Sequence, residues 1–302
     1  MLGAGRGRRF ELLTRTLPKP LLPVLGRPLV LWQLEALRAL GVRESVIVVG
    51  HLGEEIRAAL GDGSEHGVAV GYVRQEEPLG IAHALACAAP RLDRPFLCLL
   101  GDVFFEAADL APIAAALDGA DAVIGVRSEA DPREVAHNFA VTLDGDGWVS
   151  AVEEKPRHPH AGWKGVGLYV FRPPFLEVVA TTPASALRGE RELTEAIQRH
   201  VDAGARVRAV PCRGRDFNLS GPADLLAANL HALALSGKEN WIDERASVDS
   251  GASLARSVVM EGAHVERGAH LERVLVLPGE RVPPGEHRDV VFAVGEAVVA
   301  RE

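Results

Sequence analysis

Two hydrophobic patterns alternate between residues 30 and 127. Between 30 and 40 an apolar residue recurs every third or fourth position, which predicts a helix that ends at Gly41. The continuous β-branched run at 45–50 then predicts a buried parallel strand. The alternation continues with predicted helices at 54–60, 80–89 and 109–118 and predicted strands at 68–75, 96–100 and 121–127. This order predicts the α/β class with a Rossmann-like, doubly wound sheet.

The regular alternation stops after residue 130. Alternating polarity on both sides of a Gly- and Asp-rich turn at 143–147 predicts a β-hairpin over 138–154. The remaining predicted elements are strands at 165–171 and 206–211 and helices at 174–181, 192–204 and 222–235. Because a hairpin adds antiparallel strands, we expect a mixed sheet with an inserted substrate-side subdomain.

A third pattern begins near Ile242. Aliphatic residues recur about every six positions, at Ile242, Val248, Leu254, Val259, Val265, Leu271 and Leu277. This periodicity predicts a β-helix, with one irregular corner where the step from Leu254 to Val259 is five residues. The alternative is a short β-meander. We therefore expect an α/β domain at 1–237 and a β-helix domain at 238–302.

The composition is that of an ordinary globular protein. Of the 302 residues, 47% are hydrophobic and 25% are charged, which excludes a disordered chain, a collagen and a coiled coil. No apolar run reaches the roughly 18 residues that a membrane-spanning helix needs. The net charge of −8 argues against nucleic-acid and membrane-surface partners.

The charge is unevenly distributed along the chain. Residues 1–28 contain six basic side chains and one acidic side chain, so this segment carries +5 and the remainder carries −13. A local basic cluster on an acidic protein predicts a site for a small anion such as phosphate. The three cysteines are odd in number and lack metal-binding spacing. We therefore expect reduced thiols, with Cys87 and Cys98 buried, in a cytoplasmic protein.

The N-terminal segment has the residues that an anion site requires. Gly3, Gly5 and Gly7 follow Leu2, and clustered glycines let backbone N–H groups approach a phosphate closely. Arg9 would add fixed positive charge. A flexible Gly/Arg-rich tail is the alternative interpretation.

Lys19 lies between Pro18 and Pro20, which fix an extended backbone and present its ammonium group from a rigid segment. Together with the glycine loop, this segment resembles the signature of the sugar-1-phosphate nucleotidyltransferase family, the NDP-sugar pyrophosphorylases. Over 54–85 and 153–197 the chain looks most like the family's long-form glucose-1-phosphate thymidylyltransferases.

Further motifs extend this resemblance over nearly the whole chain. The segment from Gln75 to Gly80 is similar to the family's base-reading segment, and Asp102 after Gly101 is similar to its metal-binding step. Glu154 and Lys155 look like its sugar-phosphate motif, and 188–197, which contains Glu192, looks like its characteristic helix start. The hexapeptides resemble the left-handed β-helix that many members append.

The resemblance implies transfer of a nucleotidyl group from an NTP to a sugar-1-phosphate, giving an NDP-sugar and pyrophosphate. A sugar-1-phosphate is largely deprotonated at about pH 7, so the reaction needs no general base. dTTP or UTP with glucose-1-phosphate is the first choice, and GTP with mannose-1-phosphate is the second. The implied residues are catalytic Arg9, Lys19 and Asp102; nucleotide-binding Leu2, Gly3, Gly5, Gly7, Gln75 and Gly80; substrate-binding Phe139, Glu154, Lys155, Val166 and Glu192; and, for Mg²⁺, Asp102 and Asn218.

Four departures from the family pattern bear on activity. Only Met1 and Leu2 precede the glycine loop, where the family has a buried central strand, so we expect residues 1–9 to be mobile or displaced and NTP binding to be weak. Arg8 replaces a usual threonine. Asn218 replaces the second metal carboxylate, as N-acetylglucosamine-1-phosphate uridylyltransferases also do. Phe139 replaces a glycine that lets backbone approach the sugar, and would narrow the sugar pocket.

Two other functions remain open at this stage. The short start, Asn218 and Phe139 favour a nucleotide-sugar-binding regulatory subunit that has lost catalysis. An acyltransferase of the β-helix type is the third possibility, although the repeat is short. At the level of residues, Asp102 could be a helix N-cap, Gln75 a surface glutamine, and Glu154 with Lys155 a solvated charge pair. Because β-helix faces often self-associate, we expect a homo-oligomer.

Overall fold

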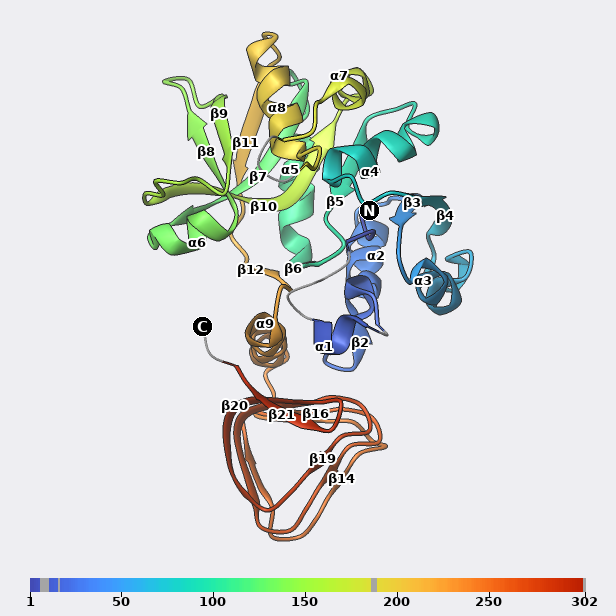
Figure 1. Cartoon of the computed structure of the whole chain (residues 1–302), viewed down its shortest axis with the longest axis vertical. Helices are drawn as coiled ribbons and strands as arrows, with labels where there is room; N and C mark the ends of the chain where they lie inside the picture. The colour runs from blue at the N-terminus through green and yellow to red at the C-terminus, as the bar shows by residue number, and fades with distance from the viewer. Residues whose placement is uncertain (6–10, 16, 186–188, 301–302) are drawn as a thin grey trace. The chain divides into compact units, whose positions relative to one another are not determined.

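The structure is a computed structural model that describes residues 1–5, 11–15, 17–185 and 189–300 (Figure 1). The chain folds into two compact units. The first unit comprises Met1–Gly5 and Gln33–Asp216, and the second comprises the described parts of 6–32 and 217–302. Among the described residues, no helix has both the length and the apolar character needed to cross a bilayer.

A mixed sheet forms the centre of the first unit, with the strand order β11-β7-β10-β8-β9 and with β5 also paired to β10. The strands are β5 (Phe96–Leu99), β7 (Ala122–Glu129), β8 (Phe139–Leu143), β9 (Val149–Glu154), β10 (Gly162–Phe171) and β11 (Val207–Pro211). β11 runs parallel to β7, whereas β10 is antiparallel to β5, β7 and β8. The predicted mixed α/β fold is confirmed, and the predicted hairpin is β8–β9.

The first residues of the chain take the place of a central strand beside a second, parallel pair, β3 (Glu44–Val49) and β4 (Ala69–Arg74). The N–H of Leu2 donates to the Leu99 carbonyl of β5, and the N–H of Gly3 donates to the Val48 carbonyl of β3, both at 2.9 Å. The expected displacement is therefore wrong for these residues. Four main-chain bonds hold them, including those from the Val48 N–H to the Met1 carbonyl and from the Gly101 N–H to the Leu2 carbonyl.

Helices and short turns complete the first unit. They are α2 (Leu29–Ala39, which begins in the second unit), α3 (Gly53–Leu60), α4 (Ile81–Ala88), α5 (Leu110–Ala115), α6 (Pro132–His137), α7 (Phe175–Thr181) and α8 (Leu193–Asp202), with the 3₁₀ turns η3 (Ser64–His66), η4 (Ala89–Arg91) and η5 (Ala107–Asp109). A further short strand, β6 (Val103–Phe105), follows β5. Neither β6 nor α6 was expected from the hydrophobic pattern.

A hydrophobic core of the first unit lies between the sheet and α4, α7 and α8. Its centre is a run of four stacked rings, Phe139, Tyr169, Phe171 and Phe175, with interplanar angles of 14°, 15° and 12° between neighbours. Fully burying one such ring stabilises the fold by roughly 1.5–3 kcal/mol. The stack therefore fixes β10 against α7, and with it the orientation of Tyr169.

The second unit contains α9 (Pro222–Leu235) and a series of short parallel strands (Figure 1). The strands are β13 (Trp241–Ile242), β14 (Ser247–Val248), β15 (Ser253–Ala255), β16 (Val258–Val259), β17 (His264–Val265), β18 (Ala269–Val276), β19 (Arg281–Val282), β20 (Gly285–Ala293) and the antiparallel β21 (Glu296–Val299). Near the N-terminus it also contains α1 (Glu11–Thr14), η2 (Lys19–Leu21), β1 (Pro23–Val24) and β2 (Arg27–Pro28). β12 (Asp216–Asn218) leads from the first unit into the second.

The parallel strands form a regular coil. Ser247 pairs with His264, which pairs with Arg281, so one turn of the coil takes 17 residues. The five-residue step after Leu254 is therefore a repeated feature, because Val259 is in register with Val276 one turn later. Val276 holds the position that the sequence pattern assigned to Leu277. A β-meander is excluded because neighbouring coil strands are parallel.

Two thiols in the first unit, buried Cys98 and half-buried Cys212, make stability depend on alkaline pH. Burial raises the pKa of Cys98 to about 11, and burial together with nearby Asp109 and Asp216 raises the pKa of Cys212 to about 12. Cys87 is only half-buried, which corrects the expectation that it is buried. A thiol with a raised pKa favours the fold fully below its unfolded pKa of about 9, and this contribution is lost as the pH rises through the folded pKa.

We expect the free energy of unfolding to fall by about 2 kcal/mol between about pH 8 and pH 11 from Cys98 alone. Urea titrations of the wild type and Cys98→Ala at both pH values measure this. The variant should show a decrease smaller by that amount. An identical pH dependence in the two proteins would mean that Cys98 does not contribute.

Candidate active site

Asp102 lies where the chain turns from β5 into β6, beside the start of the glycine loop. The N–H of Gly101 donates to the Leu2 carbonyl at 2.9 Å, and a Cβ built at Gly101 would lie 2.8 Å from that oxygen. Only glycine permits so close a passage of the two backbones. A β-strand rather than a helix follows Asp102, so the interpretation as a helix N-cap is wrong. The structure thus brings the predicted metal carboxylate next to Leu2 and Gly3.

The glycine loop is only partly described. Gly3 and Ala4 are buried, and a Cβ built at Gly50 would lie 2.9 Å from the Ala4 carbonyl oxygen. Gly5 is exposed, with open space where a Cβ would stand. Gly7, Arg8 and Arg9 lie outside the described residues. Lys19 belongs to the second unit, where it begins the 3₁₀ turn η2 directly after Pro18. Pro18 is extended as predicted, but the prediction of an extended backbone is wrong for Lys19 and Pro20, which form the turn.

Gln75 is buried, with 6% of its surface exposed, so it is not an ordinary surface glutamine. Its Nε2 donates to the Gly80 carbonyl at 3.1 Å and lies 2.9 Å from His83 Nδ1. The two protons of this amide nitrogen are therefore engaged, and the group has its carbonyl oxygen to offer to a ligand. Gly80 precedes α4 with φ +102°, a conformation that favours glycine.

Glu154 is the last residue of β9 and Lys155 follows it, and their side chains are 29% and 31% exposed. Glu154 Oε1 lies 4.0 Å from Lys155 Nζ, and Thr194 Oγ1 of α8 donates to Glu154 Oε2 at 3.3 Å. Because both charged groups are partly enclosed, a solvated surface pair does not describe them. Glu192 is buried at the N-terminal end of α8, two positions before Thr194. The two predicted sugar carboxylates therefore belong to neighbouring elements.

Phe139 and Val166 are more deeply buried than the sequence suggested. The Phe139 ring is 6% exposed, stacks on Tyr169, and covers Gly165 so closely that a Cβ there would lie 1.7 Å from the ring. Val166, which follows Gly165 in β10, is 3% exposed. Phe139 therefore belongs to the core beside Glu154, its cross-strand partner. Contact of either residue with a sugar stays a prediction.

Tyr169 was not predicted as a site residue. It is 2% exposed, and burial, aided by the nearby charges of Cys98, Glu154 and Asp102, raises the pKa of its hydroxyl well above the ordinary value. Tyr169 is thus electrostatically close to both Asp102 and Glu154, which connects the predicted metal carboxylate with the predicted sugar carboxylate. The apolar run around it predicted a strand, and nothing in that pattern distinguishes this hydroxyl from a core ring.

No group of three or more His, Cys, Asp or Glu side chains in the described part of the chain is arranged to hold a metal ion. Asn218 nevertheless has an unusual property. Its Oδ1 is buried and accepts no hydrogen bond from the described residues. A neutral carbonyl oxygen without a donor suits a hard cation such as Mg²⁺, which prefers oxygen ligands. The Asn218 oxygen therefore fits a neutral ligand of a divalent cation.

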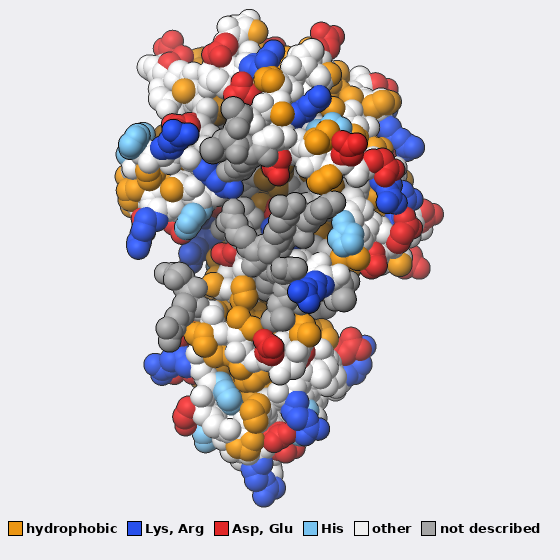
Figure 2. Space-filling model, viewed as in Figure 1, with side chains coloured by type: hydrophobic (Ala, Val, Ile, Leu, Met, Phe, Trp, Pro, Cys, Tyr) orange, Lys and Arg blue, Asp and Glu red, His pale blue; other side chains and the backbone are white. Residues whose placement is uncertain are grey.

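Acidic and basic side chains are interspersed on the visible face of each unit (Figure 2). This distribution agrees with the net charge of −8 and gives no broad basic surface on that face.

Comparison with known proteins supports the same class. The family model described as nucleotidyl transferase matches residues 1–243. A glucose-1-phosphate thymidylyltransferase of Streptomyces griseus is 35% identical over 273 residues, which cover 86% of this chain and 75% of the relative. A UTP–glucose-1-phosphate uridylyltransferase of Haloferax volcanii is 33% identical over 227 residues, which cover 74% of this chain and 91% of the relative. The crystal structure of a UDP-glucose pyrophosphorylase complexed with UDP-glucose has a TM-score of 0.68 at 20% identity, covering 78% of this chain and 97% of that one.

The chain belongs to the nucleotidyl transferase family. The resemblance inferred from the motifs is therefore confirmed. The expected type of enzyme, a sugar-1-phosphate nucleotidyltransferase that uses an NTP and a sugar-1-phosphate, is confirmed with it. This family generally uses a divalent metal in catalysis. The alternative of a regulatory subunit without catalysis has no support among these relatives.

Proposed function

We propose that the chain joins dTTP or UTP to glucose-1-phosphate, releasing pyrophosphate and forming the corresponding NDP-glucose. The convergence of Asp102, Glu154 and the start of the glycine loop on one region of the first unit carries this proposal. The names of the relatives, a thymidylyltransferase and a uridylyltransferase that both act on glucose-1-phosphate, support the choice of base and sugar.

The hydrogen bonds of Gln75 support the choice of thymine or uracil, whose rings contain an imide N–H, as the base. With Nε2 engaged by the Gly80 carbonyl and by His83, the side chain offers a hydrogen-bond acceptor rather than a donor. Thymine and uracil carry a ring N3–H that can donate to such an acceptor, whereas the ring N3 of cytosine only accepts and the donor of cytosine is its exocyclic amino group. Guanine also carries a ring N–H, so GTP with mannose-1-phosphate remains the second choice.

The roles of the other residues follow from the charge that must be neutralised. Arg9 and Lys19 would neutralise the triphosphate, and Gly3, Gly5 and Gly7 would present backbone N–H groups to it. Lys155 would hold the sugar phosphate, while Glu154 and Glu192 would accept hydrogen bonds from sugar hydroxyls. Nucleotidyl transfer depends mainly on positioning and charge neutralisation, and the sugar phosphate itself is the nucleophile.

We propose Asp102 and Asn218 as ligands of Mg²⁺. When bound, the ion neutralises charge on the reacting phosphate. Asp102 would contribute the only negative charge of this pair, and Asn218 would contribute a neutral oxygen that otherwise lacks a donor.

The remaining organisation is also proposed. We take residues 1–237 as the nucleotidyltransferase domain and 238–302 as a left-handed β-helix domain. The 17-residue parallel coil supports the β-helix, and the family resemblance supports its left hand. Self-association through this coil and a cytoplasmic location are further predictions.

Pyrophosphate release measured for dTTP, UTP, GTP, CTP and ATP, each with glucose-1-phosphate and mannose-1-phosphate, tests the choice of substrates. We expect the highest kcat/KM for dTTP or UTP with glucose-1-phosphate and no turnover with CTP. A preference for GTP with mannose-1-phosphate would replace the first choice by the second.

A further inference from the structure

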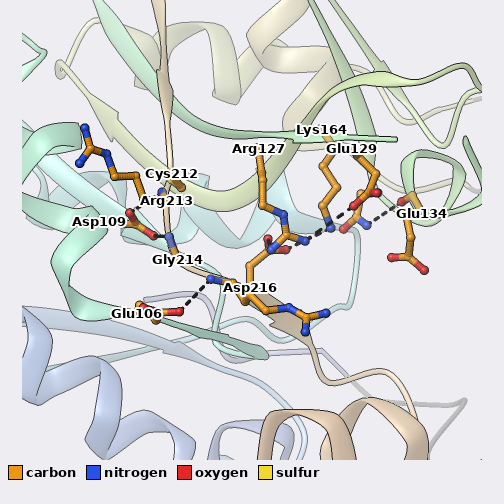
Figure 3. A network of polar contacts seen from close by, with 12 residues as sticks. Glu106, Asp109, Arg127, Glu129, Glu134, Lys164, Cys212, Arg213, Gly214 and Asp216 are labelled. Carbon is orange, nitrogen blue, oxygen red and sulfur yellow. Dashed lines mark hydrogen bonds and ion pairs between the residues drawn. The ribbon is translucent and has the colours of Figure 1, made fainter. Parts of the chain in front are cut away.

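The segment Cys212–Asp216, which leads into β12, is held at every residue by other parts of the first unit (Figure 3). The N–H of Cys212 donates to the Val126 carbonyl of β7 at 2.8 Å. The next three N–H groups all donate to carboxylates, as described below. The last residue, Asp216, is held through its side chain. Such complete anchoring of a loop is unusual because most loops bond largely to water.

Two carboxylates from the segment after Asp102 hold the middle of the loop. Asp109 accepts from the N–H groups of Arg213 and Gly214 at 2.9 and 3.1 Å, and Glu106 accepts from the Arg215 N–H at 3.0 Å. A Cβ built at Gly214 would lie 2.6 Å from the Glu106 side chain and 2.9 Å from Asp109 Oδ2. Only glycine therefore allows both carboxylates to approach this backbone.

Two cations from the sheet hold Asp216. Arg127 of β7 and Lys164 of β10 are direct cross-strand partners, an arrangement that is unfavourable for like charges alone. Asp216 lies between them, with Oδ1 2.7 Å from an Arg127 Nη and Oδ2 3.4 Å from Lys164 Nζ. Glu129 approaches Arg127 at 3.9 Å, so the four charges sum to zero. The side chains of Lys164 and Asp216 are only 3% and 7% exposed.

This arrangement bears on Asn218 through local strand geometry. Side chains two positions apart in a strand point to the same face, so Asp216 and Asn218 lie on one side of β12. The buried, paired carboxylate of Asp216 therefore fixes both the position of the β12 backbone and its rotation about the strand axis, two residues before Asn218. Asn218 needs such support because its carboxamide, unlike a carboxylate, has no charge of its own to draw it to a cation.

We propose that Asp216, clamped by Arg127 and Lys164, is a positioning residue that aims the Asn218 oxygen at the divalent cation. Asp109 and Glu106 complete the device by fixing the backbone of 213–215. This inference rests on the proposed role of Asn218 as a metal ligand. It gives a function to a buried charge cluster that takes no direct part in the reaction.

Mn²⁺ binding and hydrogen exchange test the proposal without turnover. Kd for Mn²⁺, from electron paramagnetic resonance of the free ion, should rise about tenfold in Asp216→Asn and in Lys164→Met, the usual scale for groups that orient a metal ligand. Amide exchange of the peptide 212–220 in the metal-free chain should accelerate in both variants. Lys164→Arg keeps the charge and should restore most of the Mn²⁺ affinity. Arg172→Met is the matched control, because Arg172 is tied to the Ala120 and Leu117 carbonyls and does not contact Asp216.

The outcomes separate this proposal from the metal assignment. Asn218→Ala should weaken Mn²⁺ binding at least as much as Asp216→Asn does. If Asn218→Ala weakens binding while Asp216→Asn and Lys164→Met do not, the positioning role is wrong and the metal assignment stands. If Asn218→Ala leaves Mn²⁺ binding unchanged, both are wrong. An equal loss in Arg172→Met would show a general effect of destabilisation and would also overturn the positioning role.

Discussion

Replacing Asp102 by Asn should lower kcat at least about 100-fold, the scale on which loss of a main electrostatic stabiliser acts. Asp102 stands beside Leu2 and Gly3 at the end of β5, and it is the only anion among the proposed metal ligands. Asn218 cannot compensate because its oxygen is neutral. Initial rates of pyrophosphate release at saturating NTP and sugar-1-phosphate, over a range of Mg²⁺ concentrations, measure the effect.

The fold should tolerate this change, because Asn keeps the size of Asp and the turn at Gly101 is fixed by backbone contacts. Asp93→Asn is the matched control, since the Asp93 side chain is 83% exposed and pairs with neighbouring Arg94. It should keep full activity. Near wild-type kcat in Asp102→Asn would remove Asp102 from the catalytic machinery.

Gly80→Ala should destabilise the fold by about 2–4 kcal/mol, from backbone strain together with steric overlap. Gly80 has φ +102° and ψ 176°, and an added Cβ would lie 2.5 Å from the Arg191 carbonyl oxygen. The same backbone segment continues into Glu192. Gly80 also accepts from Gln75, so the change disturbs the proposed base contact and the proposed sugar contact together. KM should rise for both substrates.

Gly41→Ala is the control that separates the cost of backbone strain from the cost of steric overlap. Gly41 has φ +87°, but nothing lies within 4 Å of a Cβ built there. This control should lose only about 1–2 kcal/mol from the positive φ and should keep both KM values. Equal losses of stability in the two variants, measured by urea unfolding, would show that contact with the Arg191 backbone is unimportant.

The sequence predicted those features whose signal is local. The spacing of aliphatic residues after Ile242 predicted a coil, because each turn repeats the same inward-facing position. The Gly- and Asp-rich turn at 143–147 predicted the hairpin that the structure shows as β8–β9. In each case a short stretch of chain carries the physical constraint, so a pattern within that stretch is sufficient.

Other features depend on residues far apart in the chain. Tyr169 belongs to the site only because β10 passes Asp102 and Glu154, which no periodicity in 165–171 indicates. The clamp on Asp216 joins residues 52 positions apart, and each of them alone would suggest an ordinary surface charge. The sequence also failed to predict that Leu2 and Gly3 take the place of a central strand. Two residues have little strand signal, yet neighbours on both sides supply their hydrogen bonds.

The most direct test of the central claim is product formation by the purified chain with dTTP or UTP, glucose-1-phosphate and Mg²⁺. Anion-exchange chromatography of the nucleotide-sugar, together with an assay of pyrophosphate, counts both products in one reaction. We expect equal amounts of NDP-glucose and pyrophosphate, formed over many turnovers and abolished by omitting the sugar phosphate. Nucleotide binding without either product, for every NTP and sugar-1-phosphate tried, would contradict the claim and would favour a binding subunit.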